Sequence, residues 1–388
     1  MSELERLIQQ HCPNGVEYKR ISDVCDISRG QVMSKDYIRD NEGDYPVYSS
    51  QTENNGELGK INTYKYDGEF LTWTTDGANA GTVFYRTGKF SVTNVCGLLK
   101  VSTPLLLVKF LYYTLYVEAP KHVSSGMGNP KLMSNVMGRI KIPVPPIEVQ
   151  CEIVRILDNF TELTAELTAE LTARKKQYEY YRDSLWTFNN IEFIKLSDLF
   201  NTRNGYTPSK SNSEFWENGI IPWFRMEDIR QNGRILSDSI QKVSKEAVKG
   251  KPFPANSLIV ATSATIGEHA LITCESISNQ RFTYLTLKEQ YKKSFDMKFL
   301  YYYCFKLDEY CKQHLNQGNF ASVDMGKFND FKFPIIPLEQ QHRIVSILDR
   351  FDTLCNDIST GLPAEIEARQ KQYEYYRDKL LNFKELEV

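Results

Sequence analysis

The chain has few of the features that mark a secreted, metal-binding or membrane-inserted protein. Its 388 residues include eight cysteines, but no two are spaced as Cys-x-x-Cys, which argues against a zinc ribbon or a disulfide framework and favours a reducing compartment. The most apolar run, 105–117, is interrupted by Lys109 and is too short to span a bilayer, and no N-terminal signal pattern precedes it. We therefore expect a soluble, cytoplasmic protein with no membrane contact, no metal and no cofactor.

A strong basic surplus is also absent. With 47 Lys and Arg against 49 Asp and Glu, the net charge of -2 argues mildly against a nucleic-acid binder, because phosphate contact normally leaves a basic footprint. The distribution changes this picture. Segments 148–188 and 338–388 each carry three more acidic than basic residues, so the remainder of the chain has a surplus of four basic residues. That surplus is compatible with DNA contact but does not prove it.

What the chain does contain is an internal duplication. The string QYEYYRD occurs at 177–183 and at 372–378, and the second copy carries four extra residues ahead of it, between Phe351 and Arg369. Further matches pair 143–148 with 334–339, 153–160 with 344–351, 109–113 with 298–302, and Gly30 with Gly205. The repeat is about half the chain, far longer than a solenoid unit, so we predict two copies of a domain-plus-helix unit.

Apolar residues at alternating spacings of four and three predict two long coiled-coil helices. The first seam runs from Leu157 to Phe188. The second runs from Ile344 to Phe383 and is broken by a four-residue stutter at Gly361-Leu362-Pro363, which predicts two pieces. The seams most simply pair antiparallel, with a head at each end and a pseudo-twofold axis; the alternative is that each helix packs on its own head.

The first helix contains a low-complexity insert, with two consecutive Thr-Ala-Glu-Leu units in segment 161–173. Each unit adds about 6 Å and about 400° of rotation to a helix. We interpret the unit formed by Thr164, Ala165, Glu166 and Leu167 as part of a spacer.

The heads are predicted to be α+β. Short β-type runs at 70–74, 258–261 and 282–287 are combined with helical patterns at 108–117 and 298–306. A short helix is also expected at 3–10, placed to lie beside the C-terminal helix. The predicted boundaries are 1–146 for the first head, 147–190 for the first spacer helix, 191–337 for the second head and 338–388 for the second spacer helix.

Taken together, these features resemble the DNA-specificity subunit of type I restriction-modification systems over essentially the whole chain. The resemblance rests on the twofold head and helix organisation, a proline-rich segment followed by Glu-x-Gln and Ile-Val-x-Ile-Leu-Asp, the Thr-Ala-Glu-Leu tandem and the paired QYEYYRD ends. In the second head, segments 221–229, 261–267 and 278–280 look like that family's target-recognition domains.

The resemblance implies a bipartite reader. Each target-recognition domain would read one half of a split sequence in double-stranded DNA, the helices would set the gap, and two methyltransferase subunits would dock, with restriction subunits added in the full complex. It also implies a non-catalytic subunit. The sequence accords with this, since it has no Asp/Asn-Pro-Pro-Tyr motif, no glycine-rich S-adenosylmethionine loop opening a helix and no GxxxxGK[ST] loop.

Loops rich in hydrogen-bonding side chains are the candidates for DNA contact, because base edges and phosphates are read by such groups. In the first head the candidates are Arg29, Gln31, Thr74, Thr75, Asn79, Asn94, Ser125, Asn129 and Lys131. In the second head they are Arg203, Tyr206, Lys210, Arg225, Thr262, Ser263, Thr265, Asn279, Gln280, Arg281, Gln317 and Asn319. The same residue types are ordinary in turns. Trp223, Arg225 and Asp228 fit a reading loop and a buried Trp beside an Arg/Asp pair equally well.

Each QYEYYRD end places three tyrosines within four helical residues, and these cannot all face one neighbour. Tyr178, Tyr181, Tyr373 and Tyr376 are therefore candidates for docking a second surface, either a head or a methyltransferase subunit. Two other classes of protein stay open at this point. One is a structural coiled-coil scaffold without a nucleic-acid role, and the other is a self-sufficient DNA methyltransferase.

Overall fold

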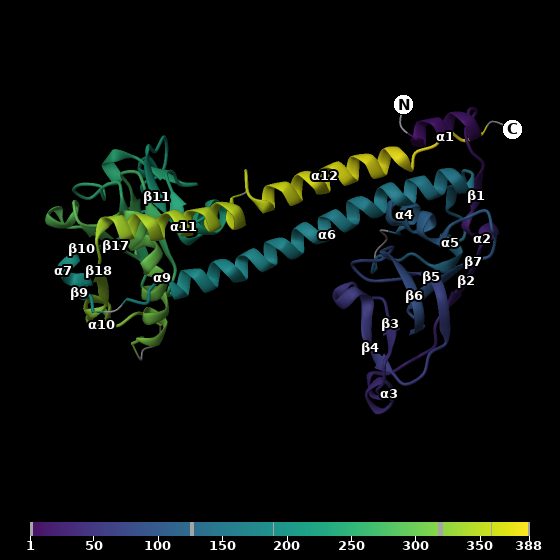
Figure 1. The fold of residues 1–388 in the computed structure, drawn as a ribbon, viewed down its shortest axis with the longest axis horizontal. Coiled ribbons are helices and arrows are strands. Elements are labelled where there is room, and N and C mark those ends of the chain that lie inside the picture. Colours follow the sequence, from purple (N-terminus) through teal and green to yellow (C-terminus); the bar gives the residue numbers. More distant parts are fainter. Residues whose placement is uncertain (1–2, 125–127, 189, 317–320, 358, 387–388) are drawn as a thin grey trace. The chain divides into compact units, whose positions relative to one another are not determined.

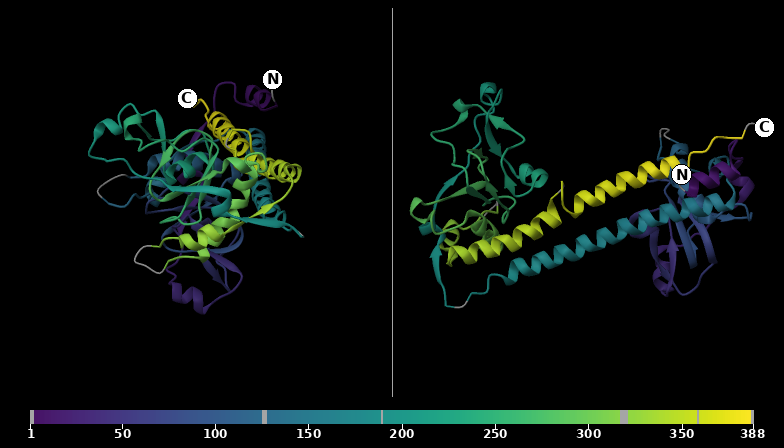
Figure 2. Two further views of the ribbon diagram at one scale, coloured as in Figure 1. Left: turned by 90° about the vertical axis from the view of Figure 1, so that its left-hand side faces the viewer. Right: turned by 45° about the horizontal axis from the view of Figure 1, so that its top comes forward.

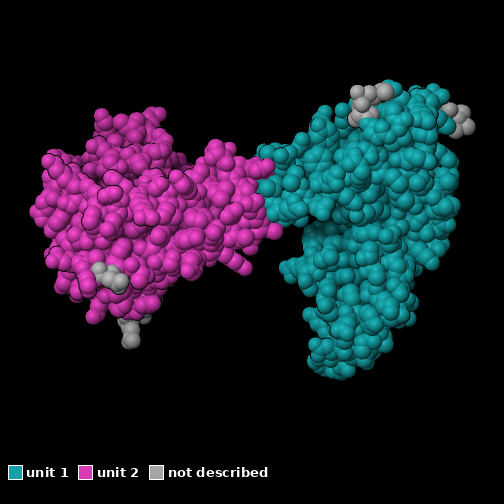
Figure 3. Space-filling view, viewed as in Figure 1, with its two compact units in different colours: residues 1–167, 366–388 teal, residues 168–365 magenta. Residues whose placement is uncertain are grey.

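The computed structural model describes residues 3–124, 128–188, 190–316, 321–357 and 359–386. The chain divides into two compact units: unit 1 comprises 1–167 and 366–388, and unit 2 comprises 168–365 (Figures 1 and 3). Each unit contains one α+β head together with part of both long helical segments. The predicted α+β class is confirmed.

The head of unit 1 is built on a six-stranded sheet with the order β2-β7-β5-β6-β3-β4. Its neighbouring strands are antiparallel except for β3 and β6, which are parallel. The strands are β2 Cys25–Arg29, β3 Tyr45–Tyr48, β4 Glu57–Ile61, β5 Tyr66–Thr74, β6 Val83–Val92 and β7 Cys96–Val101, with a separate antiparallel pair of β1 Tyr18–Arg20 and β8 Lys141–Pro143.

Helices cover this head and join its core to the long helix. They are α1 Glu3–His11, α2 Ile21–Val24, α3 Lys35–Asp40, α4 Val108–Glu118 and α5 Ser134–Met137. The apolar side of α4 supplies Phe110 and Leu111 to a cluster that also holds Trp73 from the sheet and Ile153 and Leu157 from α6 (Ile147–Ser184). The head and the first turns of α6 therefore share one hydrophobic core.

The head of unit 2 contains three sheets. Their orders are β10-β17-β14-β15-β12, β13-β11-β16 and β18-β9. The strands are β9 Glu192–Lys195, β10 Phe200–Asn204, β11 Ile221–Phe224, β12 Ile235–Leu236, β13 Lys242–Val243, β14 Ser257–Ala261, β15 His269–Ile272, β16 Ile277–Ser278, β17 Phe282–Leu287 and β18 Lys332–Ile335. The helices are α7 Leu196–Leu199, α8 Met226–Asn232, α9 Met297–Gln313 and α10 Met325–Asp330.

The strand β14 is buried along its whole length because its two faces meet different cores. Leu258 and Val260 point into the cluster formed with α9, whereas Ile259 and Ala261 point into a second cluster around Trp223 and β11. Alternation of side chains between the two faces of a strand produces this division. A continuous apolar run such as Leu258 to Ala261 is the sequence signature of a strand covered on both sides.

The long helical segments agree with the predicted pattern, including its break. The first is the single helix α6, and the second consists of α11 Leu338–Asn356 and α12 Leu362–Leu380, separated at 357–361. Pro363 lies in the first turn of α12, where its missing N–H is tolerated. The prediction of two pieces is confirmed. The predicted seam extends too far at Phe188, because α6 ends at Ser184 and the following residues pack on the core of unit 2 instead.

Within each unit the two long segments pack on one another through stacked aromatic rings. In unit 1, Phe160 of α6 lies 5.6 Å from the ring of Tyr376 of α12, and the two helices run in opposite directions there (Figures 1 and 2). In unit 2, Phe351 of α11 lies 5.4 Å from the ring of Tyr181 and 6.3 Å from that of Tyr178. The alternative in which each helix packs only on its own head is therefore wrong.

The two ends of the chain lie side by side in unit 1. The N–H of Val16 donates to the carbonyl of Lys384 at 2.9 Å, and the hydroxyl of Tyr18 donates to the carbonyl of Phe383 at 2.9 Å. The predicted N-terminal helix is present, and its residues Leu4 and Ile8 share a groove with Leu380 of α12. Among the described residues, no helix is both long and apolar enough to cross a bilayer.

Candidate functional site

One glycine at an equivalent place in each head allows two loops to meet. A Cβ on Gly30, directly after β2, would overlap the carbonyl oxygen of Val92, and a Cβ on Gly205, directly after β10, would overlap Ser278 and Asn279. Only glycine permits such an approach of backbone to backbone. The residue after each glycine then forms a hydrogen bond to the opposite loop. The Gln31 N–H donates to the Val92 carbonyl at 3.1 Å, and the Tyr206 N–H donates to the Ser278 carbonyl at 2.7 Å.

In the first head, five polar loops gather around Thr75; we name the loops 30–31, 49–52, 75–80, 93–95 and 129–131 the first loop cluster. The Thr75 hydroxyl donates to the Val95 carbonyl at 2.7 Å, and its N–H donates to the Ser50 hydroxyl at 3.1 Å. Its carbonyl accepts from the Leu132 N–H at 2.9 Å. Thr74 and Thr75 are buried, at 1% and 2% exposure. Both hydroxyls bond to backbone carbonyls of the cluster, so these two side chains hold loops together inside the head.

Five of the predicted residues of the first head are exposed on this cluster: Gln31, Asn79, Asn94, Asn129 and Lys131. The Asn94 N–H donates to the Gln31 carbonyl at 2.9 Å, and the backbones of Lys131 and Asp76 form an isolated antiparallel β-bridge. Arg29 is turned toward α5, where its Nε donates to Ser134 Oγ at 3.3 Å. Ser125 lies outside the described residues.

Sequence reasoning missed Arg86, which holds the loop between β3 and β4, part of which belongs to the first loop cluster. The residue is 3% exposed, and its guanidinium stacks 3.6 Å from the ring of Tyr48 and donates to Thr72 Oγ1 at 3.0 Å and to the Asn55 carbonyl at 2.8 Å. Burial lowers the pKa of Arg86. The residue therefore anchors the loop between β3 and β4 to the sheet. No motif in the sequence marks it, since a single Arg in a strand normally faces solvent.

In the second head, the loops 205–210, 225–227, 262–267 and 279–281 meet in the same manner, and we name them the second loop cluster. The Asn279 N–H donates to the Phe224 carbonyl at 3.0 Å, and the Thr262 N–H donates to the Arg281 carbonyl at 2.9 Å. The Thr207 hydroxyl donates to Gln280 Oε1 at 2.5 Å. Four segments that are distant in sequence thus form one polar surface.

Lys210, Trp223 and Arg225 line two depressions on this surface, of about 390 and about 350 Å³. The Arg225 guanidinium lies 5.5 Å from the Trp223 ring and pairs with Glu227 at 3.0 Å. Lys210, Gln280 and Arg281 are exposed around the depressions. Guanidinium and ammonium groups beside amide side chains can bind phosphate oxygens and the acceptor edges of bases.

The two alternatives for Trp223, Arg225 and Asp228 are resolved by their contacts. Trp223 is 5% exposed and its indole N–H donates to the Tyr206 carbonyl at 3.1 Å. The Asp228 carboxylate accepts from the N–H groups of Arg225 at 2.7 Å and of Ile240 at 2.6 Å, so it caps α8. The Trp is buried, as one alternative held, but the carboxylate paired with Arg225 is that of Glu227.

The remaining predicted residues of the second head are engaged within it to different degrees. Arg203 stacks 3.8 Å from the Phe253 ring, the Tyr206 hydroxyl accepts from the Lys249 N–H at 2.6 Å, and Thr262 Oγ1 bonds Thr283 Oγ1 at 3.0 Å. Asn279 Oδ1 accepts from the Arg281 N–H at 3.0 Å, and the backbone of Ser263 forms an isolated antiparallel β-bridge with that of Ser322. Thr265 is half-buried. Gln317 and Asn319 lie outside the described residues.

The tyrosines of the two QYEYYRD ends divide by direction in the same way in both units. Tyr178 is 7% exposed, and burial raises its pKa; burial likewise raises the pKa of its counterpart Tyr373 to about 12. Tyr181 and Tyr376 stack on the rings of the facing helix and are 37% exposed. Docking of a partner by Tyr178 or Tyr373 is therefore not supported, because both pack inside their own unit.

The tyrosines that do face outward are Tyr180 and Tyr375, at 68% and 62% exposure. The arginine of each end packs on the head helix of its unit: the Arg182 guanidinium lies 4.5 Å from the Phe305 ring, and that of Arg377 lies 5.6 Å from the Tyr116 ring. Throughout the described ranges, no three His, Cys, Asp or Glu side chains lie close enough to hold a metal ion.

Comparison with known proteins gives a consistent family. The family described as "Type I restriction modification DNA specificity domain" matches residues 13–174 and 189–368. The chain is 54% identical over 216 residues to the specificity subunit of the type I restriction enzyme EcoprrI of Escherichia coli, a match that spans 54% of each chain. It is 41% identical over 296 residues to the EcoR124I/EcoR124II specificity subunit of Escherichia coli, across 71% of each chain.

A solved structure shares the fold. The S subunit of a type I restriction-modification system from M. genitalium aligns with a TM-score of 0.57 at 15% identity, covering 95% of this chain and 96% of that one. Two α+β heads with long helices that pack together define a target-recognition architecture. The chain belongs to the specificity (S) subunits of type I restriction-modification systems, which are the non-catalytic components of these enzymes.

Proposed function

We propose that the chain recognises a bipartite site in double-stranded DNA, with one half read by each head and the gap set by the long helices. It would direct two methyltransferase subunits to that site, and restriction subunits in the full complex, in the cytoplasm where the genome lies. The observation that carries this proposal is the presence in each head of a polar loop cluster built in an equivalent way around Gly30 or Gly205.

The two clusters differ in the side chains that they expose, which supports separate targets. The first presents mainly amides, Asn79, Asn94 and Gln31, with the single cation Lys131. The second presents the exposed Lys210 and Arg281 together with the half-buried Arg225. Amides pair best with adenine, while arginine pairs best with guanine. Equivalent scaffolds with different polar surfaces are what two readers of unlike half-sites require.

The helices are suited to set a gap because α6 is continuous. It runs for 38 residues, about 57 Å, without a break, and includes the Thr-Ala-Glu-Leu tandem. Thr164 and Leu167 are half-buried, and Ala165 and Glu166 are exposed. Because four residues advance a helix by slightly more than one turn, one unit more or less leaves nearly the same face of the helix toward its neighbour. Such a helix transmits a change in its length to whatever is fixed at its ends.

The proposal is tested at Arg225 by reading which sites become methylated. Arg225→Ala is co-expressed with the cognate methyltransferase subunits. It should weaken discrimination against wrong bases in the second half-site by about tenfold to a hundredfold, since a bidentate side chain contributes about 1–3 kcal/mol of discrimination. The first half-site should be unchanged. Methylated adenines are mapped across the host genome by single-molecule sequencing.

The matched control is Arg230→Ala, which removes an exposed arginine from α8 outside the second loop cluster. It should leave both half-sites as they are. A change in the first half-site caused by Arg225→Ala, or the same relaxation in both variants, would contradict the assignment of one half-site to each head.

A further inference from the structure

A buried glutamine near the start of each long segment ties that segment to the head before it. Gln150 is the fourth residue of α6, Gln341 is the fourth residue of α11, and both side chains are fully buried. Burial of a polar amide is unfavourable unless its hydrogen-bonding groups are satisfied. In both cases they are satisfied by backbone groups.

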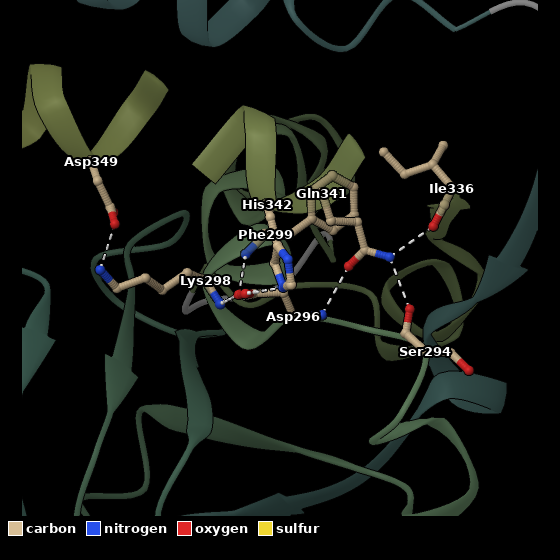
Figure 4. A network of polar contacts seen from close by, with 8 residues as sticks. All are labelled: Ser294, Asp296, Lys298, Phe299, Ile336, Gln341, His342 and Asp349. Atoms are coloured by element: carbon tan, nitrogen blue, oxygen red, sulfur yellow. Dashed lines mark hydrogen bonds and ion pairs between the residues drawn. The ribbon is translucent and has the colours of Figure 1, made fainter. Parts of the chain in front are cut away.

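Gln341 contacts three points of the backbone at once (Figure 4). Its Oε1 accepts from the Asp296 N–H at 2.8 Å, and its Nε2 donates to the carbonyls of Ser294 at 2.9 Å and Ile336 at 2.8 Å. Asp296 caps the head helix α9, and Ile336 lies between β18 and α11. One amide therefore joins the long helix, the head helix and the segment that links them.

Gln150 makes the same three contacts in unit 1. Its Oε1 accepts from the Leu107 N–H at 2.8 Å, and its Nε2 donates to the carbonyls of Leu105 and Pro145, both at 2.7 Å. A glutamine side chain offers two N–H donors and an uncharged acceptor on one planar group, which this geometry requires. The joint is thus duplicated although the loops of the two heads have diverged.

A second polar tie follows eight residues later in each helix, which is about 12 Å along the axis. An aspartate there accepts from a lysine and a tyrosine of the head helix. The distances are Lys109 to Asp158 2.6 Å, Tyr113 to Asp158 2.7 Å, Lys298 to Asp349 2.7 Å and Tyr302 to Asp349 2.8 Å. Two separated ties fix the direction of the long helix on the head as well as its point of attachment.

We propose that Gln150 and Gln341 are positioning residues for DNA recognition, which hold each head at one angle on its long helix and thereby help to select the gap between the half-sites. This inference rests on the proposed function of the heads as readers and of the helices as a ruler. One additional base pair moves a half-site by about 3.4 Å and about 35° around the duplex. A head held at two ties cannot follow that displacement, whereas a head on a loosened joint can.

Base preference should be independent of the joint. The joint of unit 1 uses the segments 105–107 and 145–150, and that of unit 2 uses 294–296 and 336–341, whereas the loop clusters are built from other parts of each head. A loosened joint should therefore change which gaps are accepted and leave the two half-sites as they are. A loss of general stability would instead reduce methylation at every site alike.

The test compares the gap lengths that each variant accepts. Gln150→Ala and Gln341→Ala are co-expressed with the methyltransferase subunits, and methylated adenines are mapped genome-wide. We expect the wild-type half-sites together with about tenfold more methylation at gaps one base pair longer or shorter, because a lost buried hydrogen bond is worth about that factor in an equilibrium. Gln340→Ala, at the exposed neighbouring position, is the matched control and should keep the single gap.

Lys109→Met and Lys298→Met weaken the second tie without emptying a buried site, since these side chains are 41% and 42% exposed. These variants should also increase methylation at gaps one base pair longer or shorter, by a smaller factor than the glutamine variants. Glutamine variants that lose methylation at the wild-type gap without gaining other gaps would overturn the inference, as would an unchanged gap in a folded complex. A wild-type map without two half-sites would contradict the proposed function instead.

Discussion

At the scale of single residues, the sequence identified which loops are polar but could not distinguish residues that face outward from those that hold the loops. Thr75 and Asn79 belong to one turn, yet Thr75 is buried by contacts to Ser50 and Val95, which are distant in sequence. Gln150 was visible within its Glu-x-Gln motif, but its role depends on the Leu105 carbonyl and the Leu107 N–H, which lie 45 and 43 residues away. Such assignments need tertiary contacts, which one sequence does not encode locally.

Asp357 offers a pH-dependent prediction at this scale, because its carboxylate organises the break between α11 and α12. It accepts from Ser359 Oγ at 2.6 Å, the Ser359 N–H at 2.7 Å and Thr360 Oγ1 at 2.9 Å. These hydrogen bonds, that from the Ser359 hydroxyl foremost, lower the pKa of Asp357 from 3.8 to about 2. Since the folded pKa is the lower one, the stabilisation is complete above the unfolded pKa and is lost as the pH falls toward 2.

We therefore expect Asp357→Ala to lower the urea midpoint of unfolding at pH 7, with a difference from wild type that shrinks as the pH is lowered from about 4 to 3. Equilibrium unfolding followed by circular dichroism at each pH measures this. Glu42→Ala, an exposed acid between α3 and β3, is the control for a general loss of negative charge. A difference that grows on acidification would contradict the assigned direction of the shift.

At the scale of elements, periodic patterns predicted the helices well because helices depend on near neighbours. The 4,3 spacing and Gly361-Leu362-Pro363 gave the long helices and their break, and the run at 298–306 gave the core of α9, although that helix extends to Gln313. The helix α8 and its Asp228 cap were missed, since the segment was read as a possible loop around Trp223. The duplication was the stronger guide, because it related distant segments that local patterns treat separately.

The paired tyrosines give a prediction at this scale. Tyr180 and Tyr375 occupy equivalent places in the two QYEYYRD ends and are the most exposed tyrosines there. We expect each to contact one methyltransferase subunit, so Tyr180→Ala and Tyr375→Ala should each weaken one of two sites by about 30-fold, the effect of truncating a tyrosine that contributes about 2 kcal/mol. Size-exclusion chromatography with light scattering should then give complexes with one methyltransferase subunit, and the double variant none.

The controls for this prediction are Glu179→Ala and Glu374→Ala, which alter the exposed neighbours of the same two tyrosines. Both controls should keep two methyltransferase subunits. Retention of two subunits by the double tyrosine variant would place the docking surface elsewhere on the protein.

At the scale of the whole molecule, the two units share a plan that the duplicated sequence encodes. Each unit combines a head, the start of the helix that leaves it and the end of the other helical segment, and the two segments stack through Phe160 with Tyr376 or Phe351 with Tyr181. A change of length in α6 therefore acts on both heads, because each end of α6 is part of a packed core. If the proposed function holds, a four-residue change in the spacer should therefore change the gap between the half-sites.

Deletion of Thr164–Leu167 tests the ruler directly. It shortens α6 by about 6 Å and rotates its far end by about 40° beyond a full turn, close to the roughly 35° twist of one base pair. We expect a preferred gap about one base pair shorter with both half-sites unchanged, and an inserted Thr-Ala-Glu-Leu unit should lengthen the gap by the same step. Glu166→Gln keeps the length of the helix and should keep the gap. Because the deletion leaves the loop clusters of both heads unaltered, altered half-sites with an unaltered gap in the deletion variant would show that α6 does not measure the DNA.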